Sequence, residues 1–371
     1  MTGTAAIEPL CVTGIGAVSA VGFDAPTACA SIRAGITRPA AIPGLIDVDP
    51  ESQEMEAVHG HPVGTLGDGF TGPARWLQLL EPCLLDLCHN GALPPWEDQV
   101  FWGGTVVFVI TPYLDSERYH PNPRCTPDAI HAALIVPLRR LLGDRFQPRS
   151  IQVLPRGRIG VFEVVAQFQR MRQTSGFERA LVVAVDSWLD GHSLSYLMTM
   201  RRLKNNANPV GLSPGEGAFA VLLEPHRSAQ HRQAGLGPVI RRSSYGAELS
   251  CLLADERSDG IGLAAQVLRV LRGVTPSLPY PTHILDLNGE SWRAAEWGGA
   301  MVRLQSGGLE LADGRQWLPA LSVGEVGAGA SILGMVIAAR AFARNYAGGP
   351  AVLLSSSDEH GDVGAMLLEK E

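Results

Sequence analysis

Continuous apolar runs of strand length alternate with helical patterns along this 371-residue sequence. Runs of this kind, bounded by Gly or Pro, are typical of strands that are buried on both faces of a sheet. The clearest are CVTGIGAV, TVVFVI, RALVVAVDS and GAFAVLLEP. Helical patterns such as APTACASIRAG and VFEVVAQFQRMRQTSG lie between them. The alternation predicts an α/β fold with helices on both faces of its sheets.

The alternation starts again after Pro225, which suggests a duplicated fold. Strand patterns in the second series are GPVIRRSSYGAE, THILDLN, PALSV, AVLLSSS and GAMLLEK, and helical patterns separate them. The break near residues 225 to 236 predicts two halves, residues 1–225 and residues 226–371. No repeat is visible in the sequence itself, so this prediction depends on the order of the elements. The Pro-rich stretch 37–100 indicates no role.

The composition excludes several classes of function. The chain is 46% hydrophobic, as a large core requires, and its net charge is −7. A nucleic-acid or anionic-membrane binder would be expected to have a basic surface instead. The first ten residues lack the basic and apolar regions of a signal peptide. The longest helix-like apolar stretch reaches Arg340 after nine residues, too few to span a bilayer. We therefore expect a cytoplasmic protein that binds neither nucleic acid nor membrane.

Motifs for metals, cofactors and hydrolysis are weak. Cys83 and Cys88 precede His89, but a spacing of five puts the two thiols on different faces of a helix. The GxSxG pattern at residues 211–215 is followed by a strand pattern, whereas a nucleophile elbow needs a helix there. The Gly-rich stretch 14–22 has Ser19 where the dinucleotide fingerprint needs its third glycine. The sequence thus predicts no metal and no cofactor.

Several segments, in the same order, resemble the β-ketoacyl-ACP synthases of the thiolase superfamily across nearly the whole chain. They are VTGIGAVSAVG (12–22), RALVVAVDSWLD (179–190), RRLKNNANPVGLSPGEGAFAVLLEP (201–225) and SDGIGLAAQVLRVL (258–271). The resemblance implies a thiolase fold, with two related halves in five layers, α-β-α-β-α. It also implies a homodimer that extends the sheet across its two-fold axis. We expect a monomer to leave the apolar helix in RGRIGVFEVVAQF near an exposed edge.

The chemistry implied by the resemblance is decarboxylative carbon–carbon condensation on an acyl thioester. In the family, a cysteine at a helix N-terminus takes the acyl group, and the helix end lowers the pKa of its thiol. Two histidines polarise the thioester carbonyl of the malonyl unit and stabilise the enolate that forms when CO₂ leaves.

At the positions that the resemblance equates with these catalytic residues, this sequence has other residue types. Arg158 or Ile159 takes the place of the cysteine, within RGRIG. Asn288 stands where the first histidine is expected, and Glu325, in the small-residue stretch SVGEVGAGAS, takes the place of the second. The resemblance therefore implies a degenerate synthase with no catalytic residues. Since a buried lone carboxylate is costly, we predict that Glu325 pairs with Arg158, or failing that with Arg156.

Three functions fit this pattern. The first is a non-catalytic pseudoenzyme that serves as a binding scaffold, adaptor or accessory protein, for instance beside a secreted-effector system. The second resembles a chain length factor, the inactive partner of a β-ketoacyl synthase. The third is an acyltransferase of the β-ketoacyl-ACP synthase type with replaced chemistry, in which Glu325 and Asn288 act in an open pocket. An effector, a synthase or an acyl carrier protein could be the partner, and the sequence does not choose among them.

Overall fold

The computed structural model describes most of the chain. The described residues are 9–48, 51–90, 93–95, 97–114, 116–119, 126–143, 149–235, 237–254, 256–273, 282–309, 311 and 314–371. All statements below concern these residues.

The first half of the main sheet has the strand order β1-β7-β6-β4-β5. The strands are β1 (Leu10–Ser19), β4 (Thr105–Thr111), β5 (Ser150–Pro155), β6 (Arg179–Ser187) and β7 (Glu216–Pro225). β4 runs parallel to β5 and β6, whereas β7 runs antiparallel to β6 and β1. β4, β6 and β7 are buried along their whole length, as their continuous apolar sequences predict.

The second half repeats this arrangement, with the order β8-β12-β11-β9-β10. The strands are β8 (Val239–Ala247), β9 (Thr282–Leu285), β10 (Gln316–Trp317), β11 (Ala351–Ser357) and β12 (Asp362–Glu369). β9 runs parallel to β10 and β11, and β12 runs antiparallel to β11 and β8. Numbered within each half, both orders are 1-5-4-2-3 with the same directions, so the fold is duplicated. A domain boundary at residues 225 and 226 remains a prediction.

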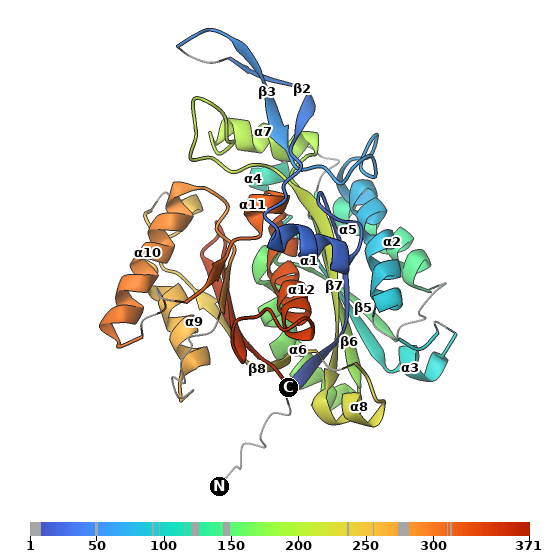
Figure 1. The fold of residues 1–371 in the computed structure, drawn as a ribbon. Coiled ribbons are helices and arrows are strands. Elements are labelled where there is room, and N and C mark those ends of the chain that lie inside the picture. Colours follow the sequence, from blue (N-terminus) through green and yellow to red (C-terminus); the bar gives the residue numbers. More distant parts are fainter. Residues whose placement is uncertain are drawn as a thin grey trace.

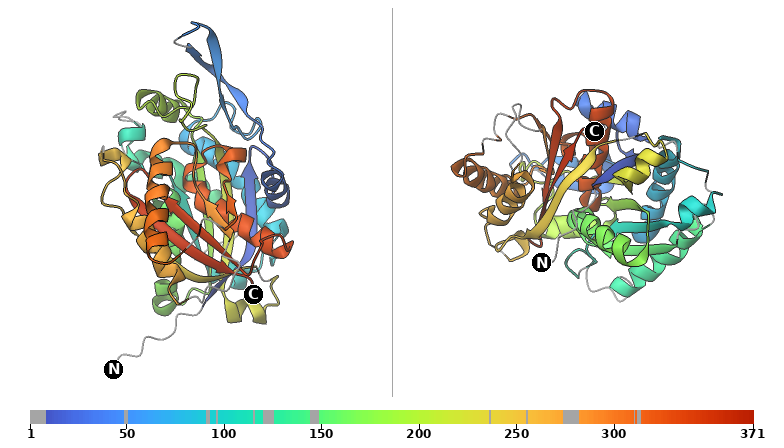
Figure 2. Two further views of the ribbon diagram at one scale, coloured as in Figure 1. Left: turned by 60° about the vertical axis from the view of Figure 1, so that its left-hand side comes forward. Right: turned by 90° about the horizontal axis from the view of Figure 1, so that it is seen from below.

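The two halves meet in the middle of the strand order, where the beginnings of β1 and β8 pair, and enclose a central helical layer. β1 pairs with β8 only through Leu10–Ile240 and Cys11–Val239. Between the halves lie α6 (Gly160–Ser175) and α12 (Ala330–Ala343), which both contact strands of each half. The outer layers are α2 (Gly72–Asn90) with α5 (Pro127–Gly143), and α9 (Ile261–Leu271) with α10 (Ser291–Ser306). The result is five layers, α-β-α-β-α (Figures 1 and 2).

Two expectations about single elements were wrong. α6 does not lie near an exposed edge, because strands of both halves cover its apolar residues within one chain. It therefore gives no argument for a dimer. The segment PALSV forms the short helix α11 (Ala320–Val323) rather than a strand. A short apolar run fits either structure, so its pattern alone could not decide.

The remaining elements connect these layers. They are α1 (Ala25–Arg33), α3 (Gln99–Gly103), α4 (Ser116–Tyr119), α7 (Gly191–Thr199), α8 (His226–His231), and the 3₁₀ turns η1 (Gly157–Ile159), η2 (Leu252–Ala254) and η3 (Gly327–Gly329). β2 (Ala40–Val48) and β3 (Met55–Gly60) form a separate hairpin that projects at the top of Figure 1. Within the described residues, no helix combines the length and the hydropathy needed to cross a bilayer.

Candidate functional site

The candidate site lies where strands of both halves reach their carboxyl ends, the usual location of sites in α/β sheets. Arg158 follows β5 in the elbow η1, which leads directly into α6. Asp286 follows β9, and Asn288 lies two residues further on. Glu325 lies in the loop between α11 and η3, and η3 leads into α12. The elbow, the loop after β9 and the loop before α12 therefore converge on one place between the halves.

Arg158 and Glu325 form a buried ion pair, as the sequence predicted. Arg158 Nη2 lies 3.0 Å from Glu325 Oε1, and the two side chains are 3% and 2% exposed. Arg158 Nη1 also donates to Asp286 Oδ2 at 3.2 Å. Arg156, the other candidate partner, instead pairs with Glu163 at 3.2 Å in a largely exposed contact. The arginine at the elbow is thus held between two carboxylates.

Asn288 binds Oε2 of Glu325, the carboxylate oxygen that Arg158 does not pair with. Its Nδ2 donates to Glu325 Oε2 at 2.6 Å and to Glu290 Oε2 at 3.0 Å. The other carboxylate oxygen of Glu325, Oε1, which also pairs with Arg158, accepts a hydrogen bond from the backbone N–H of Gly327 at 2.6 Å. Burial alone would raise the pKa of Glu325, but Arg158, Arg293 and these hydrogen bonds outweigh it and hold the pKa below its usual value. Glu325 is therefore ionised and fully paired.

The small residues around Glu325 allow a close approach of backbone to side chains. Gly327 has φ +48°, and a Cβ there would overlap Asp186 Oδ2. Gly324 has φ +70°, and a Cβ there would lie 2.6 Å from the ring of His61. The N–H of Ala328, also in this loop, donates to Asp186 at 3.0 Å. The loop is thus packed between charged groups and the imidazole.

Of the four residues equated with family positions, Arg158, Asn288 and Glu325 come together, and Ile159 does not. Ile159 is buried in the apolar core between the halves, in the same cluster of buried side chains as Phe162 and Ile332. It contributes packing and no polar group to the site.

Sequence reasoning missed the wider network of buried charges around this trio. Arg202 pairs with both oxygens of Glu290, at 2.7 and 2.9 Å. Arg293 lies 3.3 Å from Asp286, and Glu359 lies 3.5 Å from Arg202. The position of Asp286 directly after a buried strand was the available signal. The long-range pairing of arginines with acids carried no sequence signal.

A second buried pair lies beside the trio. Arg118 Nη2 lies 2.8 Å from Asp186 Oδ1, and its guanidinium stacks 3.8 Å from the centroid of the Trp188 ring. Through Asp186, this pair contacts the loop that carries Glu325. The site is therefore tied to both halves by charge-assisted hydrogen bonds.

Little space is left at the site. A cavity of about 30 Å³ lies between Arg118, Arg158 and Glu359, and one of about 20 Å³ lies beside Arg158 and Glu325. Such volumes hold one or two water molecules. A larger cleft of about 520 Å³ lies under the β2–β3 hairpin and is lined by Asn288 but not by Glu325. Glu325 and Asn288, which the replaced-chemistry hypothesis needs in one open pocket, are instead hydrogen-bonded to each other, and of the two only Asn288 lines the larger cleft.

No thiol lies at the elbow, where residues 153–172 contain no Cys, Ser or Thr. Cys29 and Cys83 are buried, and burial raises the pKa of Cys29 to about 12 and that of Cys83 well above its usual value. Cys125 lies outside the described residues. Cys251 lies against Gly361, in the loop between β11 and β12. Among the described residues, no three His, Cys, Asp or Glu side chains are placed to hold a metal ion.

Comparisons with known proteins identify the fold. No model of a protein family matches the sequence, and no curated protein matches it. Solved structures do match. The AntDE:AntF complex, a type II polyketide synthase acyl-carrier protein with its ketosynthase bound to the hexaketide, has a TM-score of 0.75 and 14% identity. The match covers 98% of this chain and 99% of that chain.

Two further matches agree. The ishigamide ketosynthase/chain length factor has a TM-score of 0.69 and 16% identity, and the match covers 98% and 99% of the two chains. The ketosynthase from module 6 of the bacillaene synthase of Bacillus subtilis 168 has a TM-score of 0.70 and 12% identity, with 98% of this chain and 72% of that chain covered. This chain therefore has the thiolase-type fold of the ketosynthases over nearly its whole length.

Proposed function

We propose that this chain is a non-catalytic, ketosynthase-like subunit that pairs with a catalytic ketosynthase, in the manner of a chain length factor. The observation that carries the proposal is the closed ion pair between Arg158 and Glu325, bridged by Asn288, at the elbow before α6. The interior that a condensing enzyme would use for an acyl thioester is filled here by paired side chains.

Three features of the site argue against condensation. The elbow offers a guanidinium in place of a nucleophile, since Arg158 is held by Glu325 and Asp286. A ligand pocket for an acyl group needs roughly 300 Å³ or more, and the two cavities that Arg158 lines have about 30 and 20 Å³, whereas Arg158 and Glu325 do not line the 520 Å³ cleft. An ionised Glu325 would also repel the carboxylate of a malonyl unit.

Pairing with another thiolase-fold chain is supported by the free edge of β5. β5 forms the end of the main sheet, and its residues SIQVLP include no charged side chain. Sheet edges without charge or covering elements favour pairing with a further strand. Among the matched structures, one is a ketosynthase/chain length factor and another holds a ketosynthase with its acyl-carrier protein. These two matches favour the role of a chain length factor over that of a free-standing scaffold. No surface among the described residues indicates which effector a scaffold would bind.

The test combines this chain with a purified ketosynthase from the same organism that keeps its catalytic cysteine. We expect a one-to-one complex in light scattering, and a change in the chain length of the ketosynthase products when this chain is present. The variant Ile151→Lys, which places a charge on β5, should weaken the complex. Val302→Lys, at a 63% exposed position on α10, is the matched control and should not.

Two results would overturn the proposal. One is an unchanged product length together with no complex for any such ketosynthase of the organism. The other is malonyl decarboxylation by this chain alone that Glu325→Gln abolishes, since that would make it an enzyme with replaced chemistry.

A further inference from the structure

A further pocket, which shares no lining residue with the two small cavities of the ion-pair site, lies between α1, α12 and the segment around β10. It has a volume of about 200 Å³. Its walls are mainly apolar and come from four separate segments: Cys29, Ile32, Trp317, Leu318, Leu321, Ile337 and Tyr346. The rings of Trp317 and Tyr346 lie 5.9 Å apart, inclined at 45°. An apolar cavity of about 150 Å³ accepts benzene, so this pocket has room for one ring with a short substituent.

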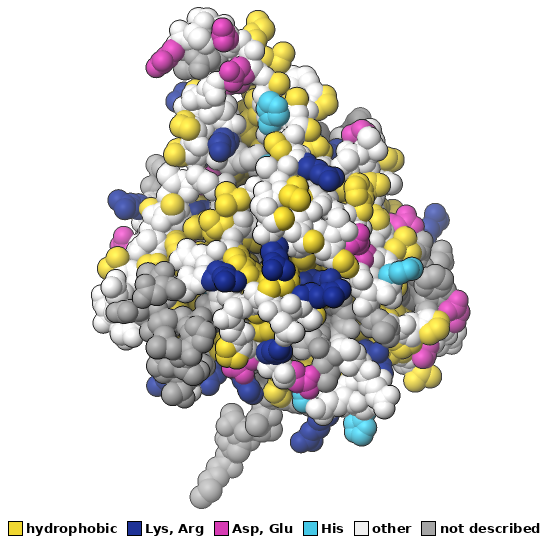
Figure 3. All heavy atoms as spheres, viewed as in Figure 1, with side chains coloured by type: hydrophobic (Ala, Val, Ile, Leu, Met, Phe, Trp, Pro, Cys, Tyr) yellow, Lys and Arg dark blue, Asp and Glu magenta, His cyan; other side chains and the backbone are white. Residues whose placement is uncertain are grey.

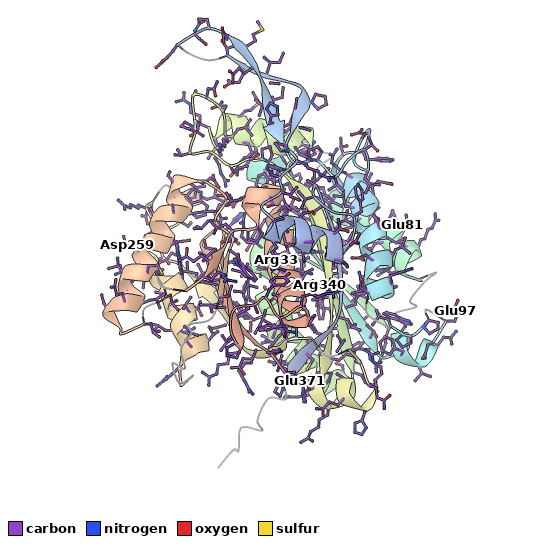
Figure 4. All side chains as sticks on the ribbon, in the orientation of Figure 1. Arg33, Glu81, Glu97, Asp259, Arg340 and Glu371 are labelled. Carbon is purple, nitrogen blue, oxygen red and sulfur yellow. The ribbon has the colours of Figure 1, made fainter. Side chains whose placement is uncertain are left out.

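Two arginines lie near this pocket, and one of them lines it. Arg33, the last residue of α1, lines it, and its guanidinium lies 4.3 Å from the centroid of the Tyr346 ring. Arg340 lies one helical turn after Ile337 on α12, and Figure 4 shows it beside Arg33. Figure 3 shows Lys and Arg side chains grouped over α1 and α12, with hydrophobic atoms between them. The surface here combines an apolar cavity with a cationic rim.

These arginines lack anionic partners within the described part of the chain. No ion pair there involves Arg33 or Arg340, in contrast to the fully paired arginines of the ion-pair site. Both arginines nevertheless affect the pKa of the same residue of the pocket wall, Tyr346. Burial raises the pKa of Tyr346 to about 12, and the charges of Arg340 and Arg33 oppose that rise. Two unpaired guanidinium groups beside one apolar cavity are suited to an anionic head group.

We propose that this pocket binds a small aromatic carboxylate, with its ring packed against the wall formed by Trp317 and Tyr346 and its carboxylate toward Arg33 and Arg340. The two inclined aromatic rings favour a flat body over a flexible chain, because aromatic rings pair edge-to-face or offset. Arginine binds a carboxylate through two parallel hydrogen bonds, which fixes the orientation of the ligand. The site is independent of the proposed function, since it shares no residue with the ion-pair network.

Benzoate is the probe, measured by isothermal titration calorimetry on the full chain. Benzyl alcohol, of similar size but neutral, tests the charge, and hexanoate tests the ring. We expect benzoate to bind more tightly than either. Arg33→Gln and Arg340→Gln should each weaken benzoate binding on the order of tenfold while leaving the weak binding of benzyl alcohol unchanged.

Two variants make the result specific. Leu321→Trp, at a 72% exposed position on the rim, should block the pocket without disturbing the core. Arg303→Gln, on α10 and away from the pocket, should bind benzoate as the unaltered chain does. The proposal is overturned if benzoate shows no binding up to about 10 mM, or if Arg33→Gln and Arg340→Gln bind it unchanged. Tighter binding of hexanoate than of benzoate would overturn the assignment of an aromatic ligand.

Discussion

At the scale of single residues, the most informative feature is a cation at the start of a helix. Arg158 precedes α6 by two residues, where the helix dipole favours an anion. Two carboxylates offset this unfavourable placement, since the guanidinium of Arg158 lies 3.0 Å from Glu325 and 3.2 Å from Asp286. The sequence could predict the first of these partners, because the resemblance placed both segments at one site. Asp286 was not predicted: its position after a buried strand indicated a site, but its contact with Arg158 depends on side-chain geometry.

Substitutions of Arg158 and Glu325 should have non-additive effects on the free energy of unfolding. Arg158→Met leaves two buried carboxylates short of a partner and should lower the free energy of unfolding by about 3–5 kcal/mol. Glu325→Gln should cost less, because Arg158 keeps Asp286. The double variant should cost less than the sum of the two by about 1–3 kcal/mol. Urea denaturation measures all three.

The neighbouring residue supplies the control for this cycle. Arg156→Met breaks only a largely exposed pair with Glu163 and should change stability by less than about 1 kcal/mol. Strict additivity of Arg158→Met and Glu325→Gln would show that the two side chains do not depend on each other.

Asp358 should give stability a pH dependence of the opposite sign to that of Glu325. Burial first, then the charges of Glu359 and Asp362, raise the pKa of Asp358 from 3.8 to about 7, against the opposing effects of His360 and Arg158. Its contribution to stability is complete below the unfolded pKa, near pH 4, and is lost as the pH rises through about 7. Glu325, with its lowered pKa, contributes above about pH 4.5 and loses that contribution as the pH falls.

Replacing Asp358 by Asn isolates this effect. The N–H groups of His360 and Asp362 donate to Oδ1 of Asp358, and an asparagine oxygen can accept the same bonds. Between pH 5 and pH 8, roughly the range of the shifted group, the variant should lose less stability than the unaltered chain. Asp259→Asn, whose side chain is 69% exposed, should show the unaltered profile. Parallel profiles for Asp358→Asn and the unaltered chain would contradict the assignment.

At the scale of elements, the buried strands were the easiest to predict and the short connecting segments the hardest. β4, β6 and β7 consist of apolar residues buried on both faces, so their sequences carry a continuous signal. PALSV was read as a strand although it forms α11, because four helical residues are too few to show a period. The β2–β3 hairpin was missed, since its strands are mostly exposed and lie in a Pro-rich stretch.

The edge of β5 should control self-association of the chain. Ile151 and Val153 on this strand are only partly buried, and no further strand among the described residues pairs with it. We expect light scattering to give about twice 39.5 kDa for the unaltered chain at micromolar concentration. Ile151→Lys should give the mass of a monomer, because an edge lysine opposes strand pairing while its methylene groups still cover the apolar surface.

Val302→Lys makes the same chemical change on the outer face of α10 and should leave the dimer intact. A monomeric mass for the unaltered chain would end the dimer proposal without affecting the fold.

At the scale of the whole molecule, the order of elements along the sequence sufficed to predict the duplication, but not the closure of the interior. Both halves have the strand order 1-5-4-2-3, although no repeated sequence is visible. The closure depends on contacts between residues more than 80 positions apart, such as Arg158 with Glu325 and Arg202 with Glu290. Periodicity and motifs reflect residues that are close together in the sequence, so they do not predict such pairs.

The closed interior predicts no covalent acyl intermediate. After incubation with acyl-CoA or an acyl-ACP, intact-mass spectrometry should show no stoichiometric adduct on the chain. Acylation needs a thiolate within about 3–3.5 Å of the thioester carbon, and the elbow holds Arg158 in place of a thiol. The control is Cys251→Ser, which removes the half-buried thiol beside Gly361. An adduct that forms on the unaltered chain would contradict the prediction, because the ion-pair site offers no nucleophile. Its loss in Cys251→Ser would assign it to Cys251, and its persistence there would place it on another residue.

The pairing of β1 with β7 also bears on how the protein is made. On the ribosome, Leu10–Ser19 emerges some 200 residues before its partner strand, Glu216–Pro225. At about 5–20 residues per second, β1 waits on the order of tens of seconds for that partner. α12, which covers the inner faces of both halves, arrives later still. Until then, the nascent chain presents apolar strands that a chaperone would shield, and the rate of synthesis becomes a determinant of yield.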